Sequence, residues 1–85
     1  MHESLMFVSE RFPAVRDRMI GLFERDESFR ELCEEYQACA RTLARLESEA
    51  APGSEDLQRE YHALLLRLER EMLDELRARP GGAGP

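Results

Sequence analysis

The strongest constraint on this fold is a set of apolar residues spaced alternately three and four positions apart between residues 29 and 46. Such spacing is typical of a single apolar seam along one side of an α-helix. The seam consists of Phe29, Leu32, Tyr36, Cys39, Leu43 and Leu46. A second apolar helix follows a short break at residues 50–53. We therefore predict an all-α chain whose main element is a long antiparallel helical hairpin with coiled-coil character.

The predicted second arm of the hairpin, residues 55–78, carries a broad apolar face. At 100° per residue this face is formed by Leu57, Tyr61, Leu64, Leu65, Leu68, Met72 and Leu76. Leu66 and Leu73 fall on the opposite side. A shorter helix precedes the hairpin and begins near Pro13, a residue favoured in a first helical turn. The predicted organisation is a flexible N-terminus at 1–11, a hairpin domain at 12–79 and a disordered Gly/Pro tail at 80–85.

Two alternatives remain for the start of the first long helix. Ser28 and Glu31 have the spacing of a capping box, in which each side chain satisfies a backbone amide of the first turn. Asp26 is the competing N-cap and would place Glu27 in that turn. Both alternatives begin a helix close to residue 27.

The charge pattern argues against several classes of partner. The formal net charge is −6, and all twelve basic residues are arginines interspersed with acids. A surface for nucleic acid or anionic membranes requires clustered cations, so we expect neither partner. No apolar run approaches the roughly 20 residues of a membrane span. The start of the chain also lacks the features of a secretory signal, and a cytoplasmic location is expected.

The residues with reactive side chains do not form a recognisable catalytic or metal motif. Cys33 is followed by Glu34 and Glu35, which should raise its pKa, and Cys39 lies in the seam as a small core residue. We expect no catalytic residue, no cofactor and no metal. The alternative is a small bundle that binds a ligand or metal through His62 and the two tyrosines, Tyr36 and Tyr61, which could approach each other across the hairpin.

Self-association is the expected source of additional core, because a two-helix hairpin covers only one side of each helix. We predict a non-enzymatic interaction module that forms a homodimer or larger helix bundle. The apolar residues expected between chains are Phe12, Met19, Phe23, Leu66 and Leu73. The same surface would suit an amphipathic helix of another protein.

Four segments resemble the YdcH-like family of small bacterial proteins of unknown function. They are Phe12-Pro13 with Arg16-Asp17, then Phe29-x-x-Leu32-x-x-x-Tyr36, Leu43-x-x-Leu46-Glu47, and Leu66-x-Leu68-x-x-Glu71-Met72-Leu73. The resemblance covers roughly residues 12 to 77. It implies a cytoplasmic helical hairpin and no established activity. The chain departs from the family pattern at Cys39-Ala40, where relatives often have Leu-Asp.

Overall fold

The computed structural model describes residues 2–49 and 51–78, and all regular structure in these two ranges is helical. In chain order the elements are α1 (Glu3–Arg11), the 3₁₀ turn η1 (Pro13–Val15), α2 (Arg16–Arg25), α3 (Glu27–Glu49) and α4 (Glu55–Ala78). The predicted all-α class is confirmed for the described residues. Residues 1, 50 and 79, and the tail predicted at 80–85, lie outside them.

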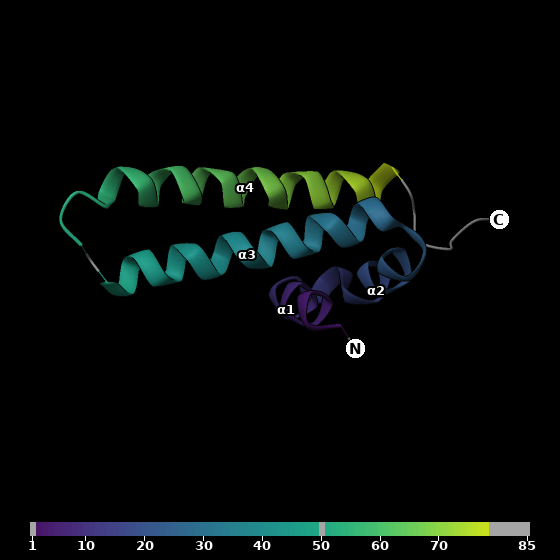
Figure 1. Ribbon diagram of the computed structural model, residues 1–85. Coiled ribbons are helices and arrows are strands. Elements are labelled where there is room, and N and C mark those ends of the chain that lie inside the picture. The colour runs from purple at the N-terminus through teal and green to yellow at the C-terminus, as the bar shows by residue number, and fades with distance from the viewer. Residues whose placement is uncertain (1, 50, 79–85) are drawn as a thin grey trace.

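Helices α3 and α4 lie side by side along their whole length, with α1 and α2 packed near one end (Figure 1). Two long-range hydrogen bonds mark how the long helices meet. The Tyr36 hydroxyl donates to Glu69 Oε2 over 2.7 Å. Nearer the connecting loop, the Cys39 thiol donates to the carbonyl oxygen of Tyr61 over 3.3 Å. The loop itself turns at Gly53, whose φ of 84° is accessible to glycine without strain.

Asp26 determines where α3 begins. Its Oδ1 accepts a hydrogen bond from the Phe29 amide over 3.1 Å, the N-cap geometry that satisfies a free donor of the first turn. The backbone amide of Asp26 meanwhile donates to the carbonyl oxygen of Leu22 over 2.9 Å, which ends α2. One residue therefore both ends α2 and caps α3, whereas Ser28 lies exposed inside the helix.

The N-terminal segment differs from the flexible N-terminus expected at 1–11. Residues 3–11 form helix α1, and its side chains Leu5 and Val8 are buried in the main core. At its start, His2 Nδ1 accepts a hydrogen bond from the Ser4 amide over 3.2 Å. A helix of nine residues has little stability by itself, so α1 depends on packing against α3.

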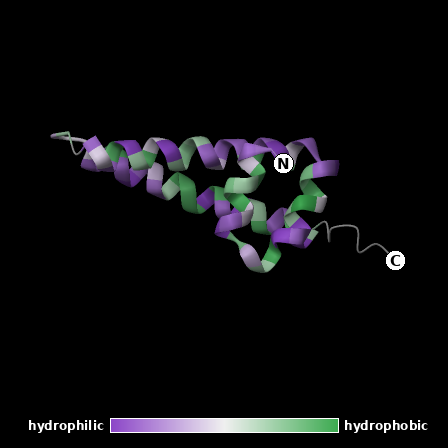
Figure 2. Cartoon of the chain, turned by 90° about the horizontal axis from the view of Figure 1, so that it is seen from below, coloured by the Kyte–Doolittle hydropathy of each residue, from purple (hydrophilic) through white to green (hydrophobic). Residues whose placement is uncertain are grey.

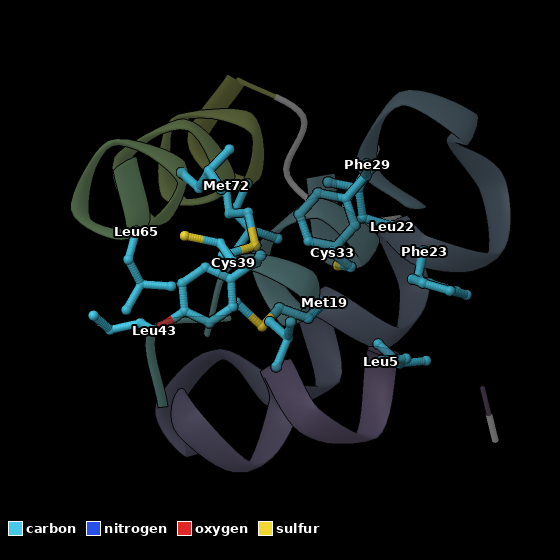
Figure 3. Packing of buried hydrophobic residues seen from close by; sticks show 14 residues of the cluster. Leu5, Met19, Leu22, Phe23, Phe29, Cys33, Cys39, Leu43, Leu65 and Met72 are labelled. Atoms are coloured by element: carbon cyan, nitrogen blue, oxygen red, sulfur yellow. The ribbon is translucent and has the colours of Figure 1, made fainter. Parts of the chain in front are cut away.

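The core lies where all four α-helices meet and extends into the space between α3 and α4 (Figure 3). Figure 2 shows hydrophobic and hydrophilic residues alternating along the helices, as expected when each buries only part of its surface. The buried hydrophobic residues are Leu5, Val8, Met19, Leu22, Phe23, Phe29, Cys33, Tyr36, Cys39, Leu43, Leu65, Leu68, Met72 and Leu76.

An arginine joins α2 to the far end of α4. Arg18 donates from Nη2 to the carbonyl oxygen of Leu76 over 2.7 Å. The last carbonyls of a helix have no partner within the helix, and a cation is favoured beside them. The contact therefore stabilises the end of α4 and fixes the position of α2 against it.

Candidate interaction surface

The two cysteines lie in the core rather than in a reactive setting. Cys33 and Cys39 are both buried and free. Burial raises the pKa of the Cys33 thiol from 9.0 to about 12, and the charge of Glu34 adds to this shift. Burial also raises the pKa of Cys39. The predicted direction for Cys33 is therefore found, with burial rather than neighbouring acids as its main cause.

The residues of the predicted ligand or metal box are not brought together. Tyr36 packs on the rings of Phe7 and Phe12, with centroids 6.0 and 6.1 Å away, and the structure shows no ring contact with Tyr61 among the described residues. Burial and the hydrogen bond to Glu69 raise the pKa of the Tyr36 hydroxyl. His62 is exposed. Within residues 2–49 and 51–78, no three His, Cys, Asp or Glu side chains are grouped to hold a metal ion.

The five residues expected between chains have different surroundings in the structure. Met19 and Phe23 are buried in the core of the same chain. Phe12 and Leu73 are half-buried and pack against that core. Leu66 alone among the five is a large exposed side chain, with 56% of its surface accessible. Packing within one chain thus covers Met19 and Phe23 fully and Phe12 and Leu73 in part, whereas Leu66 stays exposed.

A different apolar surface remains open between the two long helices. An open groove of about 270 Å³, called here the α3–α4 groove, is lined by Glu35, Ala38, Cys39, Thr42, Tyr61, Leu64 and Leu68. A second depression of about 210 Å³ extends it toward the loop and is lined by Leu57, Glu60, Tyr61 and Leu64. Leu57 is 42% exposed at that end. The two depressions share Tyr61 and Leu64, so they form one continuous surface.

The groove lies on the side of α3 that α1 does not cover. Helix α1 meets α3 through an ion pair between Glu3 and Arg41 and a hydrogen bond from Gln37 to Glu3. At 100° per residue, Gln37 and Arg41 lie about 120–160° around the helix from Glu35, at the groove rim. The N-terminal helices therefore cover one flank of the α3–α4 pair and leave the opposite flank free.

A larger depression of about 440 Å³ lies beside α1 and η1, lined by Met6, Ser9, Glu10, Pro13 and Arg16. All five residues come from one short stretch of chain, and three of them are polar or charged. The exposed apolar side chains of this surface, Met6 and Pro13, both belong to that short segment. The α3–α4 groove, with several apolar residues from two long helices, is the better candidate for binding another helix.

The apolar residues of α4 that line the groove were recognised in the sequence, but they were predicted to be buried against the first long helix. Leu57, Tyr61, Leu64 and Leu68 were all expected on the face that packs against the first long helix. In the structure only Leu68 of these four is buried. The helical angle separates the groove residues from the buried ones. Leu57 and Leu64 lie toward the edge of the apolar face, about 80–100° around the helix from the buried Leu65.

The comparisons with known proteins give no relative. No family model matches this chain. No curated protein and no solved structure matches it significantly either. Across the described residues, none of the helices has both the length and the apolar character needed to cross a membrane.

Proposed function

We propose that this chain is a non-enzymatic helical interaction module that associates with further copies of itself. In this proposal α3 and α4 act as an antiparallel, coiled-coil-like hairpin, and copies assemble into a helix bundle through the α3–α4 groove. The observation that carries the proposal is the continuous apolar groove, open on the flank that α1 and α2 leave uncovered. A cytoplasmic location and membership of the YdcH-like family are parts of the same proposal.

The physical support comes from apolar surface that the single chain leaves in water. Leu57 is 42% exposed, and Tyr61 and Leu64 are only half-buried. Covering such surface contributes roughly 25 cal/mol per Å². A small helical domain has a limited core, so association through this groove would add stability that one chain lacks. A helix of a different protein is the competing occupant of the same surface.

Light scattering over a wide range of protein concentrations tests the proposal. We expect a dimer or larger species that dissociates on dilution. A monomer at every concentration would refute self-association, and the groove would then have to be examined for binding of a foreign helix.

Helix α4 offers a matched pair of variants, because it carries exposed leucines inside and outside the groove. Leu57→Asp places a charge in the groove, and Leu66→Asp places the same charge outside it, at a position that is 56% rather than 42% exposed. We expect L57D to weaken association roughly ten-fold or more and L66D to leave it unchanged. The reverse result would leave self-association intact and move the interface to Leu66.

A further inference from the structure

Four charged residues on the free flank of the hairpin have no partner within the described chain. Glu35 and Arg45 lie on α3, and Glu60 and Arg67 lie on α4. None of the four takes part in a hydrogen bond or ion pair among residues 2–49 and 51–78. Other exposed charges do pair within the chain, such as Arg41 with Glu3 and Arg59 with Asp56. These four charges are thus available to another molecule, and Glu31 on α3 and Glu71 on α4 are likewise exposed and unpaired among the described residues.

These charges are arranged symmetrically along each helix. Glu35 and Arg45 lie five positions on either side of residue 40, and Glu60 and Arg67 are centred between residues 63 and 64. The hydrogen bonds from Tyr36 to Glu69 and from Gln58 to the Leu46 carbonyl fix how α3 and α4 are aligned. Interpolation between them places residue 40 level with residues 64–65. The centres of the two charge pairs therefore agree to within about one residue, close to the height of Leu64 in the groove.

Opposite charges at equal distances from one centre are complementary to their own image after a two-fold rotation. Resting on the proposed function, we propose that the occupant of the α3–α4 groove is a second copy of this chain, related by a two-fold axis that crosses the helices at the level of Leu64. Each long helix then lies antiparallel to its counterpart. Glu35 meets Arg45 of the second copy, and Glu60 meets Arg67 of the second copy.

The residues nearest the axis suit close approach of two helices. Ala38 and Thr42 lie at equal distances from residue 40 and exchange places under the rotation, so that small side chains face each other between the α3 helices. On α4, Leu64 meets its own copy, which brings two half-buried leucines into contact. The small residues and the leucine pair form an interface centre that excludes water, and the four charged residues lie around this centre.

The size of the surface is compatible with a stable dimer. A helix of 23 residues such as α3 is about 34 Å long, and two helices side by side are about 20 Å wide. The resulting footprint of roughly 700 Å² is close to the roughly 800 Å² that each partner contributes to a specific interface. The same register places Glu31 opposite Glu49 of the second copy at both ends, where both are exposed and salt screens their repulsion.

Charge reversal on α3 tests this register, because both partners of the proposed ion pair are in every chain. We expect Arg45→Glu and Glu35→Arg each to weaken dimerisation roughly ten-fold, since each places like charges together at two symmetric positions. The double variant R45E/E35R restores opposite charges and should return the dissociation constant to within about three-fold of the wild type. Neither side chain has a partner within the described chain, so the fold should be retained, as circular dichroism would show.

Arg16→Glu is the matched control, since Arg16 is exposed at the start of α2, away from the groove, and the substitution changes the net charge as Arg45→Glu does. It should leave the dissociation constant unchanged, and rising salt should weaken the wild-type dimer. If the single reversals have no effect, or the double variant is no better than the singles, the proposed register is wrong. A wild-type dimer that L57D dissociates would then still support the proposed function. A wild-type monomer would overturn both.

Discussion

Replacing Tyr36 by Phe should destabilise the fold through the loss of a single hydrogen bond. The ring of Tyr36 is completely buried, and its hydroxyl donates to Glu69 Oε2 over 2.7 Å, joining α3 to α4. Phenylalanine keeps the ring contacts with Phe7 and Phe12. A hydrogen bond to a charged group contributes about 1.5–3 kcal/mol, and hydration of the half-exposed Glu69 after its loss reduces the cost to about 1–2 kcal/mol.

In a domain of this size, that loss corresponds to a decrease in melting temperature of about 5–15 °C. Calorimetry or circular dichroism at one fixed, low protein concentration would measure it, because association shifts apparent stability. Tyr61→Phe is the control, since the Tyr61 hydroxyl has no hydrogen-bond partner among the described residues. A double-mutant cycle with Glu69→Ala should give a coupling of about 1 kcal/mol or more. A coupling near zero, or equal effects of Y36F and Y61F, would refute the reasoning.

Two further predictions concern the backbone and alkaline pH. Gly21→Ala should stabilise the protein by up to about 1 kcal/mol in urea denaturation, because an added Cβ inside α2 has no neighbour within 4 Å. Gly53→Ala should destabilise the protein by about 1 kcal/mol, because the φ of +84° at this position is strained for any residue with a side chain. Equal effects of the two glycine substitutions would contradict this reasoning. Stability should fall as pH rises above about 9, because burial raises the pKa of Cys33 from 9.0 to about 12 and the folded state retains a proton that the unfolded state loses. Urea midpoints between pH 7 and 10.5 would show this fall, and a Cys33→Ala variant with the same pH slope would disprove the assignment.

The long helices could be predicted from the sequence because their signals are local. Residue 55 was expected to begin the second long helix and residue 78 to end it, and α4 has these limits. Asp26 and Ser28 were competing caps, since both have acceptable chemistry. The choice between them depended on the backbone conformation between α2 and α3, which places Asp26 Oδ1 near the Phe29 amide. The local sequence pattern therefore predicted the positions of the long helices more reliably than it predicted which residue caps α3.

The surroundings of the side chains were harder to predict because they depend on helix α1. A nine-residue segment with the buried residues Leu5 and Val8 has no strong helical signal, so it was expected to be flexible. Its packing, together with α2, buries Met19 and Phe23 within the chain and leaves the opposite flank of α3 as the exposed side. The candidate groove therefore follows from tertiary packing, and no spacing within α3 or α4 alone specifies it.

The placement of α1 and α2 near one end of the long helices divides the molecule into a thick end and a thin end (Figure 1). At the thick end, Phe29 and Met72 are completely buried, whereas Leu46 and Leu57 near the loop retain exposed surface. Segments with fewer buried contacts open at lower free energy than the global unfolding of the domain. Hydrogen exchange should therefore be fastest near the loop, where the helices can separate and close again while the thick end stays folded. The two long helices are therefore expected to separate most readily at the end where their apolar surface is most open.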